Sequence, residues 1–162
     1  MGQFRAIVTD IPGTTTDIIH HQLHTEHGET MTFLDSPGLL DFTDELPYIH
    51  YIIQNADLLL FVVEDTVGIT AKEQHILELI RAEKKQHSTF LIVNKLDVKW
   101  KESETDLALA EYYTLGIEKV IGISAKTERN LNEIQEQLFN FFRHWKKEHP
   151  TYVQPSEEST TT

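Results

Sequence analysis

The chain alternates between continuous apolar runs and stretches in which apolar residues recur at helical spacing. The runs at 58–63, 90–93 and 120–123 are typical of strands that are buried on both faces of a sheet. Two further strands, at 22–26 and 30–35, flank a turn at His27-Gly28 and are expected to form an antiparallel hairpin. Helices are predicted at 46–56, from Thr70 onward, at 104–115 and from Asn130 onward. This alternation predicts an α/β fold.

Helix boundaries are marked by capping residues. Glu73 follows Thr70 by one helical turn, and Glu133 follows Asn130 in the same way, so both helices are expected to begin with a capping box. Gly116 is expected to end the helix that starts at Glu104. The last helix carries an apolar stripe, formed by Leu131, Ile134, Leu138, Phe141 and Phe142.

Length and composition favour one domain followed by a polar tail. The chain has 162 residues, of which 40% are hydrophobic, enough for a substantial core. After Trp145 the helical periodicity ends, and residues 155–162 contain no apolar side chain. We therefore expect a domain over residues 1–145, and a disordered tail or inter-domain linker over residues 146–162.

The charge and residue content exclude several classes of function. A formal net charge of −12, from 26 acidic and 14 basic residues, argues against a broad cationic surface for nucleic acid. The chain has no cysteine, which excludes disulfides and thiolate metal sites. No apolar run approaches the roughly 20 residues that a membrane span needs. The interpretation at this level is a cytoplasmic domain that does not enter a membrane.

Candidate chemistry is concentrated in four short motifs. In order along the chain they are Pro12–Asp17 (PGTTTD), Asp35–Gly38 (DSPG), Asn94–Asp97 (NKLD) and Ser124–Lys126 (SAK). NKLD and SAK each follow a predicted buried strand, which places them at the carboxyl edge of the sheet, where open α/β folds bind ligands. Taken alone, each motif could equally be an ordinary polar turn.

In this order the motifs resemble the G domain of translation-factor-type GTPases, in the group that contains Der (EngA), Era and TrmE. The resemblance covers Phe4 to about Phe142, and the segments 56–63, 68–73 and 111–116 resemble Der more closely. It implies a P-loop NTPase-type G domain, with a mostly parallel sheet covered by helices on both faces. It also implies that the ligands are GTP or GDP and Mg²⁺.

The resemblance assigns the guanine base to the third and fourth motifs. Asp97 would accept hydrogen bonds from the guanine ring N1–H and the exocyclic amine, a donor pair that adenine lacks. Asn94 would approach the other edge of the base, and the stem of Lys95 would lie along it. Ser124 would orient its loop. The Ala125 backbone N–H would face the guanine carbonyl, and Lys126 would lie beside it.

The first two motifs are assigned to the phosphates and the metal. Thr15 and Asp35 would contribute to the Mg²⁺ shell, and the Gly38 backbone N–H would meet the γ-phosphate. No catalytic residue can be assigned, because Leu39 stands where Ras-like GTPases orient water with Gln.

One element of this kind of site has no counterpart in the sequence. The phosphate-cradling loop has the pattern G-x-x-x-x-G-K-[ST], and the chain contains no Gly-Lys pair. The chain thus resembles a G domain that begins after its first strand and phosphate loop. We expect weak nucleotide and Mg²⁺ binding, and little or no GTP hydrolysis by this chain alone.

The missing first strand should lie at the centre of the sheet, between the strands at 30–35 and 58–63. Three outcomes are open: these strands pair directly, another chain donates a strand, or the domain remains incomplete and aggregates.

Three functions follow from the resemblance. The first is part of a Der-like GTPase that acts, in its intact form, on the ribosomal large subunit or its assembly intermediates. The second is the G domain of a TrmE-type tRNA-modification GTPase. The third is a nucleotide-free, G-like interaction module or a domain completed by a partner chain.

Overall fold

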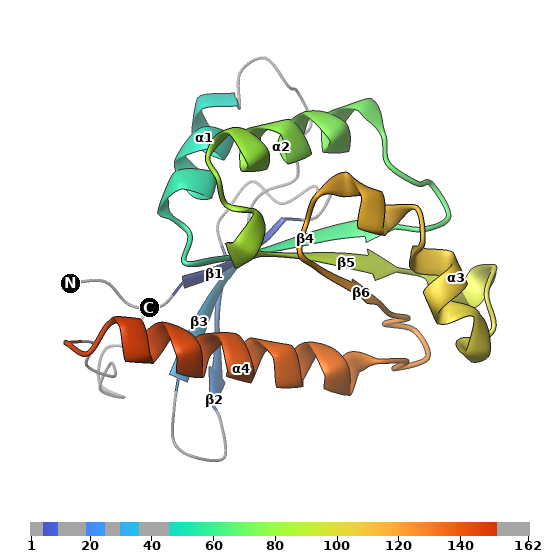
Figure 1. Cartoon of the computed structure of the whole chain (residues 1–162). Coiled ribbons are helices and arrows are strands. Elements are labelled where there is room, and N and C mark those ends of the chain that lie inside the picture. Colours follow the sequence, from blue (N-terminus) through green and yellow to red (C-terminus); the bar gives the residue numbers. More distant parts are fainter. Residues whose placement is uncertain (1–4, 10–18, 25–29, 36–45, 152–162) are drawn as a thin grey trace.

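A single mixed sheet organises the part of the chain that the computed structural model describes, residues 5–9, 19–24, 30–35 and 46–151. Its strands lie in the order β2-β3-β1-β4-β5-β6 (Figure 1). Their bounds are β1 Arg5–Thr9, β2 Ile19–His24, β3 Thr30–Asp35, β4 Leu58–Glu64, β5 Thr89–Asn94 and β6 Lys119–Gly122. The β2–β3 pair is antiparallel, and all other neighbours are parallel. Parallel pairing brings the carboxyl ends of β1, β3, β4, β5 and β6 to one edge.

Helices cover both faces of this sheet. Those in the described ranges are α1 Leu46–Asn55, α2 Ala71–Ala82, α3 Thr105–Leu109 and α4 Leu131–Glu148, with short 3₁₀ turns η1 Gln86–Ser88, η2 Leu96–Val98, η3 Glu102–Glu104 and η4 Tyr112–Leu115. Figure 1 shows α1 and α2 on one side of the sheet and α4 along the other. The expected α/β architecture, a mostly parallel sheet with helices on both faces, is therefore confirmed.

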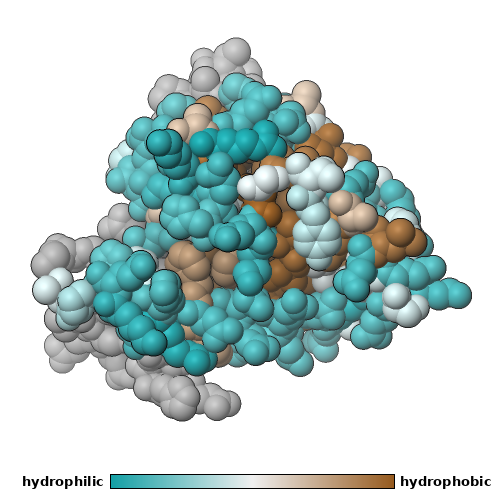
Figure 2. Space-filling view, viewed as in Figure 1, coloured by the Kyte–Doolittle hydropathy of each residue, from teal (hydrophilic) through white to brown (hydrophobic). Residues whose placement is uncertain are grey.

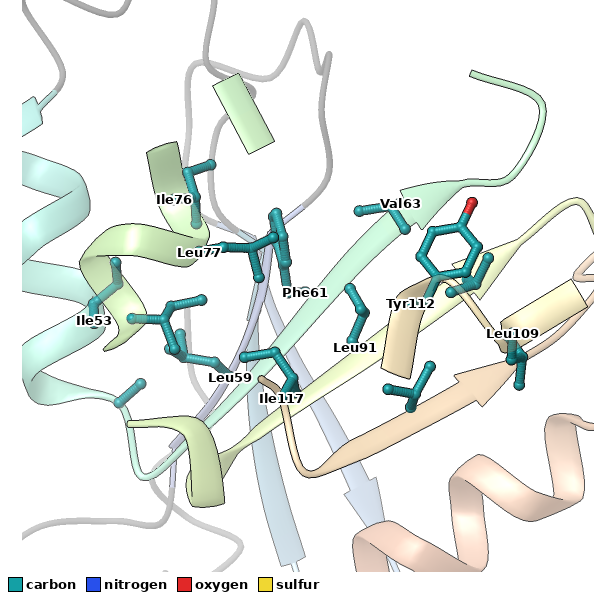
Figure 3. Packing of buried hydrophobic residues seen from close by; sticks show 14 of the residues in the cluster. Ile53, Leu59, Phe61, Val63, Ile76, Leu77, Leu91, Leu109, Tyr112 and Ile117 are labelled. Atoms are coloured by element: carbon teal, nitrogen blue, oxygen red, sulfur yellow. The ribbon is translucent and has the colours of Figure 1, made fainter. Parts of the chain in front are cut away.

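Strand β4 supplies side chains to both hydrophobic layers. Leu59, Phe61 and Val63 pack with α1 and α2, whereas Leu58 and Leu60 pack on the α4 side. Alternation along a strand produces this division, so an uninterrupted apolar run is what a strand covered on both faces requires. Figure 3 shows side chains of β4 directed toward the helical layer that contains Ile76 and Leu77 of α2.

The predicted apolar stripe of the last helix packs on the sheet. Leu138 and Phe142 are buried, and Phe141 meets Phe90 of β5 edge-to-face with ring centroids 5.8 Å apart. Leu131 and Ile134 are partly buried against the same layer. The outward side of α4 is hydrophilic in the view of Figure 2. No helix among the described residues has the length and apolar content to cross a membrane.

The N-terminus of α2 has the capping box that the sequence predicts. The Thr70 backbone N–H donates to Glu73 Oε2 at 2.6 Å, and the Glu73 N–H donates to Thr70 Oγ1 at 3.5 Å. The predicted hairpin is also present, with its first strand beginning earlier than expected, at Ile19.

The expectation that the central strand of the sheet is missing is wrong. β1, formed by Arg5–Thr9, lies between β3 and β4 and pairs with both in parallel. The physical reason is that an open position at the centre of a sheet would leave two rows of backbone donors and acceptors without partners. The chain's own N-terminal segment fills the position, an outcome that differs from all three left open above.

The predicted helix over 104–115 is interrupted. It divides into α3 and η4, because the chain turns after Leu109 and places Tyr112 in the core at 1% exposure. Gly116 does follow the segment, in the left-handed region at φ 82°.

The start of the last helix also differs. Asn130 precedes α4 at φ 60° without a side-chain cap, because its Nδ2 donates instead to the Gly122 carbonyl at 2.8 Å. The capping box predicted there is therefore wrong.

Candidate functional site

The candidate site lies where β4, β5 and β6 end. Two backbone hydrogen bonds join the segments that leave these strands. The Asp65 N–H donates to the Asn94 carbonyl at 2.9 Å, and the Leu96 N–H donates to the Ile123 carbonyl at 3.2 Å. The loops after the three strands are therefore connected before any side chain is considered.

The NKLD loop is built around a buried leucine. Lys95 takes a left-handed conformation at φ 65°, which turns the chain sharply after β5. Leu96 then points inward and is fully buried. Gly122 of β6 leaves the space for it, since a Cβ at Gly122 would lie 2.5 Å from Leu96 Cδ1. The loop is thus positioned by packing as well as by backbone bonds.

Side chains from NKLD and SAK bind one another across the site. Ser124 Oγ donates to Asp97 Oδ1 at 2.7 Å, and the Ala125 N–H donates to Asn94 Oδ1 at 3.0 Å. Ser124 is fully buried, whereas Asp97 is partly exposed. Within the described ranges, no hydrogen bond reaches Asp97 Oδ2. The structure therefore brings Asn94, Asp97, Ser124 and Ala125 together and leaves a carboxylate oxygen available.

The two lysines of these motifs differ. Lys95 Nζ lies 2.9 Å from Glu64 Oε1, with 47% and 32% of the two side chains exposed. Such an exposed pair contributes little to stability, about 0–1 kcal/mol, but it holds the lysine stem beside the loop. Lys126 is exposed.

Of the residues predicted to bind phosphate and metal, only Asp35 lies in the described part of the chain. Thr15 and Gly38 lie outside the described residues, and so do the PGTTTD motif and Leu39. Asp35 is the last residue of β3, and its backbone lies beside Val8 of β1. In residues 5–9, 19–24, 30–35 and 46–151, no group of three or more His, Cys, Asp or Glu could hold a metal ion.

A buried carboxylate next to the site was not predicted. Asp65, 6% exposed, accepts hydrogen bonds from Trp100 Nε1 at 2.9 Å and from the Tyr112 hydroxyl at 3.0 Å. Burial, and then the bond to Asp65, raise the pKa of Tyr112 well above its usual value. The signal available in the sequence was the position of Asp65, directly after an apolar strand at the ligand-binding edge.

Arg129 was also missed. Its guanidinium donates from Nη1 to the Trp100 carbonyl at 3.0 Å and from Nη2 to the Lys101 carbonyl at 2.8 Å. No spacing in the sequence points to these contacts, because backbone carbonyls accept hydrogen bonds whatever the residue type.

Comparison with known proteins matches this geometry to one family. A family model described as "50S ribosome-binding GTPase" matches residues 1–95, more than half of the chain. The chain belongs to the 50S ribosome-binding GTPase family. GTPases of this family bind guanine nucleotides and Mg²⁺ in general.

Curated relatives carry two different names. The tRNA modification GTPase MnmE of Desulforamulus reducens is 30% identical over 141 residues, covering 84% of this chain and 29% of the relative. The GTPase Der of Aquifex aeolicus is 32% identical over 156 residues, covering 91% of this chain and 34% of the relative. The chain thus spans about a third of the length of these relatives.

A solved structure supports the fold. Era, in a complex with MgGDPNP and nucleotides 1506–1542 of 16S ribosomal RNA, matches with a TM-score of 0.71 and 18% identity. The match covers 86% of this chain and 56% of the Era chain.

Proposed function

We propose that this chain is the guanine-recognising part of a Der-type GTPase whose intact form acts in assembly of the large ribosomal subunit. The observation that carries the proposal is the linked pair of loops, in which Asp97 is bonded to Ser124 and Asn94 to Ala125. The Der relative that aligns with 91% of the chain supports the choice of branch, as does the resemblance of residues 111–116 to Der.

The carboxylate of Asp97 selects the base. Ser124 occupies one lone pair of Oδ1 and so holds the carboxylate in a single orientation. Its remaining acceptor positions can receive the N1–H and exocyclic N–H of guanine side by side. Adenine presents no such pair, and its binding would leave a partly desolvated carboxylate unpaired, which is costly.

The other residues define the remaining edges of the base. In this proposal the Ala125 N–H faces the guanine carbonyl. The guanine carbonyl and Asn94 Oδ1 would then both accept from this one N–H. The ion pair with Glu64 keeps the aliphatic stem of Lys95 beside the loop, where it can cover the face of the base. Lys126 contributes positive charge at the rim.

Phosphate and metal binding complete the proposal. Gly38 would contact the γ-phosphate, and Thr15 and Asp35 would hold Mg²⁺, which neutralises charge on the phosphate oxygens. Because the sequence contains no G-x-x-x-x-G-K-[ST] motif, we expect base contacts to dominate. This chain alone should bind nucleotide weakly and hydrolyse GTP little or not at all.

The wider assignments belong to the same proposal. The G domain would cover residues 1–145 and a tail or inter-domain linker residues 146–162, with α4 continuing past this boundary to Glu148. A role in ribosome assembly would place the protein in the cytoplasm, with the ribosomal large subunit or its assembly intermediates as partners.

Ligand-observed NMR titration with GDP and ADP tests base recognition. We expect a dissociation constant for GDP of about 1 mM, equivalent to about −4 kcal/mol, and no measurable binding of ADP. Asp97→Asn should abolish the preference for GDP, because the amide replaces one of the two acceptor oxygens with an NH2 donor, which would face an N–H of the guanine. Asp106→Asn is the matched control, since Asp106 is exposed on α3, and it should leave GDP binding unchanged. Equal binding of GDP and ADP would refute base recognition.

The MnmE branch is the second candidate, because an MnmE relative is 30% identical over 84% of the chain. Sedimentation with purified large ribosomal subunits would support the Der branch, and retention of tRNA in a filter-binding assay would support the MnmE branch. A folded chain that binds neither GDP nor ADP would instead support the interaction module or partner-completed domain.

A further inference from the structure

We propose that Arg129 is a positioning residue that sets the orientation of Asp97 and thereby the selectivity for guanine. The inference rests on the proposed function, and it concerns a residue outside all four motifs. Arg129 lies between β6 and α4, in the connection that also carries SAK.

Arg129 is joined to Ser124 through the backbone. The Arg129 N–H donates to the Ser124 carbonyl at 3.0 Å, and the Ser124 N–H donates to the Arg129 carbonyl at 3.2 Å, so the two residues form an isolated antiparallel bridge. Ser124 is the residue whose hydroxyl holds Asp97. The backbone of Arg129 therefore braces the hydrogen-bond donor for the carboxylate.

The side chain of Arg129 holds the loop on the other side of Asp97. Nη1 donates to the Trp100 carbonyl, and Nη2 donates to the Lys101 carbonyl and to Thr105 Oγ1. These acceptors lie just after the η2 turn that contains Asp97. One residue thus connects the two segments between which the carboxylate is held.

The chemistry of these contacts requires a planar fork. The acceptors are two carbonyl oxygens and a hydroxyl, and no salt bridge to a carboxylate is formed within the described ranges. Arg presents several N–H donors in a fixed geometry, whereas the ammonium of Lys is a single point. Arg129 Nε is buried and has no hydrogen-bond partner among the described residues. The hydrogen bonds of the Arg129 side chain are therefore made by its terminal nitrogens, Nη1 and Nη2.

The test compares GDP with inosine diphosphate, which lacks the exocyclic amine that Asp97 would bind. In the wild-type chain, we expect GDP to bind more tightly than inosine diphosphate. Arg129→Ala should weaken GDP binding by about three- to tenfold and weaken inosine diphosphate binding less, because that base makes only the N1–H contact to Asp97, so that the preference for GDP falls. A purely structural role would weaken both ligands equally, and that result would overturn the proposal.

Three variants complete the design. Arg129→Lys keeps the charge and should still lose most of the preference, because the fork is lost. Arg143→Ala removes the same charge from an exposed position on α4 and should change nothing. In the double variant with Asp97→Asn, the two losses should be strongly non-additive, since both act through one carboxylate.

Hydrogen exchange separates failure of this inference from failure of the proposed function. In ligand-free protein, Arg129→Lys should raise exchange in residues 96–104 and leave β5 protected. If the wild-type chain binds no guanine nucleotide, the proposed function fails, and faster exchange confined to 96–104 still supports positioning by Arg129. Unchanged exchange in that segment would overturn positioning by Arg129. Arg129→Lys replaces Arg129→Ala in the binding comparison if Arg129→Ala does not fold.

Discussion

The two halves of the sheet are built from different kinds of sequence. The half formed by β4, β5 and β6 consists of apolar strands that bury both faces, and each is followed by site residues. The other half contains a hairpin, β2–β3, and β1, whose central position no motif or apolar run predicts. In the first half the strands are specified by their own composition. In the second half, β1 is specified by the need of β3 and β4 for a partner.

This difference shows how much sheet topology can impose on a segment. β1 has only three consecutive apolar residues, Ala6-Ile7-Val8, between Arg5 and Thr9, and so short a run does not identify a central strand. It is nevertheless bonded on both sides, because the cost of unpaired backbone groups at the centre of a sheet exceeds the weak preference of a short segment.

Proline in β1 tests the comparison most strongly. Ile7 pairs with Leu34 on one side and Leu59 on the other. Ile7→Pro removes a backbone donor from a central strand, and we expect the free energy of unfolding to fall by about 3 kcal/mol or more. Urea denaturation followed by circular dichroism measures this change.

The comparison strand is β5, in which Ile92 is also bonded on both sides. Ile92→Pro should destabilise the chain at least as much as Ile7→Pro. If Ile7→Pro leaves the urea midpoint unchanged, while Ile92→Pro unfolds the protein, then β1 does not hold the central position.

A smaller effect is expected in the half that carries the site. Gly122→Ala would place a methyl group against Leu96 and Leu109, and such overpacking costs about 1–3 kcal/mol. Leu96→Ala leaves space at the same point, so the double variant should lose less stability than the sum of the two single variants. Additive losses by urea denaturation would contradict the packing of Leu96 against β6.

The smallest effect concerns the hydroxyl next to the site. Tyr112→Phe removes a hydrogen bond to buried Asp65, which should cost about 1–2 kcal/mol at neutral pH. The folded-state pKa of Tyr112 is raised, so the folded chain holds this proton more tightly than the unfolded chain does. The associated stability is fully present below about pH 10 and is lost as pH rises above it.

Unfolding free energies measured between pH 8 and pH 11 should therefore fall more steeply for the wild type than for Tyr112→Phe, by up to about 1.4 kcal/mol per pH unit. Tyr113→Phe is the control, because Tyr113 is 52% exposed, and it should retain the wild-type slope. Parallel curves for wild type and Tyr112→Phe would exclude a contribution from this hydroxyl.

Local patterns in the sequence were sufficient to predict much of the fold. The run at 58–63 predicts β4, and the Thr70–Glu73 pair predicts both the start of α2 and its capping box. The proximity of NKLD and SAK follows from parallel pairing of β5 and β6, which brings their carboxyl ends to the same edge. These inferences depend on periodicity and on residues close together in the chain.

The parts that could not be predicted depend on distant residues. The interruption of the helix after Leu109 is explained by the burial of Tyr112 against Asp65, which lies in another loop. Arg129 is placed by carbonyl groups, which carry no sequence signature. The roles of Thr15, Asp35 and Gly38 stay predictions.

The position of β1 also has a consequence for how the protein is made. Arg5–Thr9 leaves the ribosome before either of its neighbours, and Ala6 pairs with Leu58, which is synthesised much later. β1 can pair with β3 earlier, but its other edge has no partner in the nascent chain until β4 has emerged. Pairing between distant segments slows folding and exposes strand edges to aggregation. Chaperones would therefore protect the chain most during the part of translation before β4 can pair with β1.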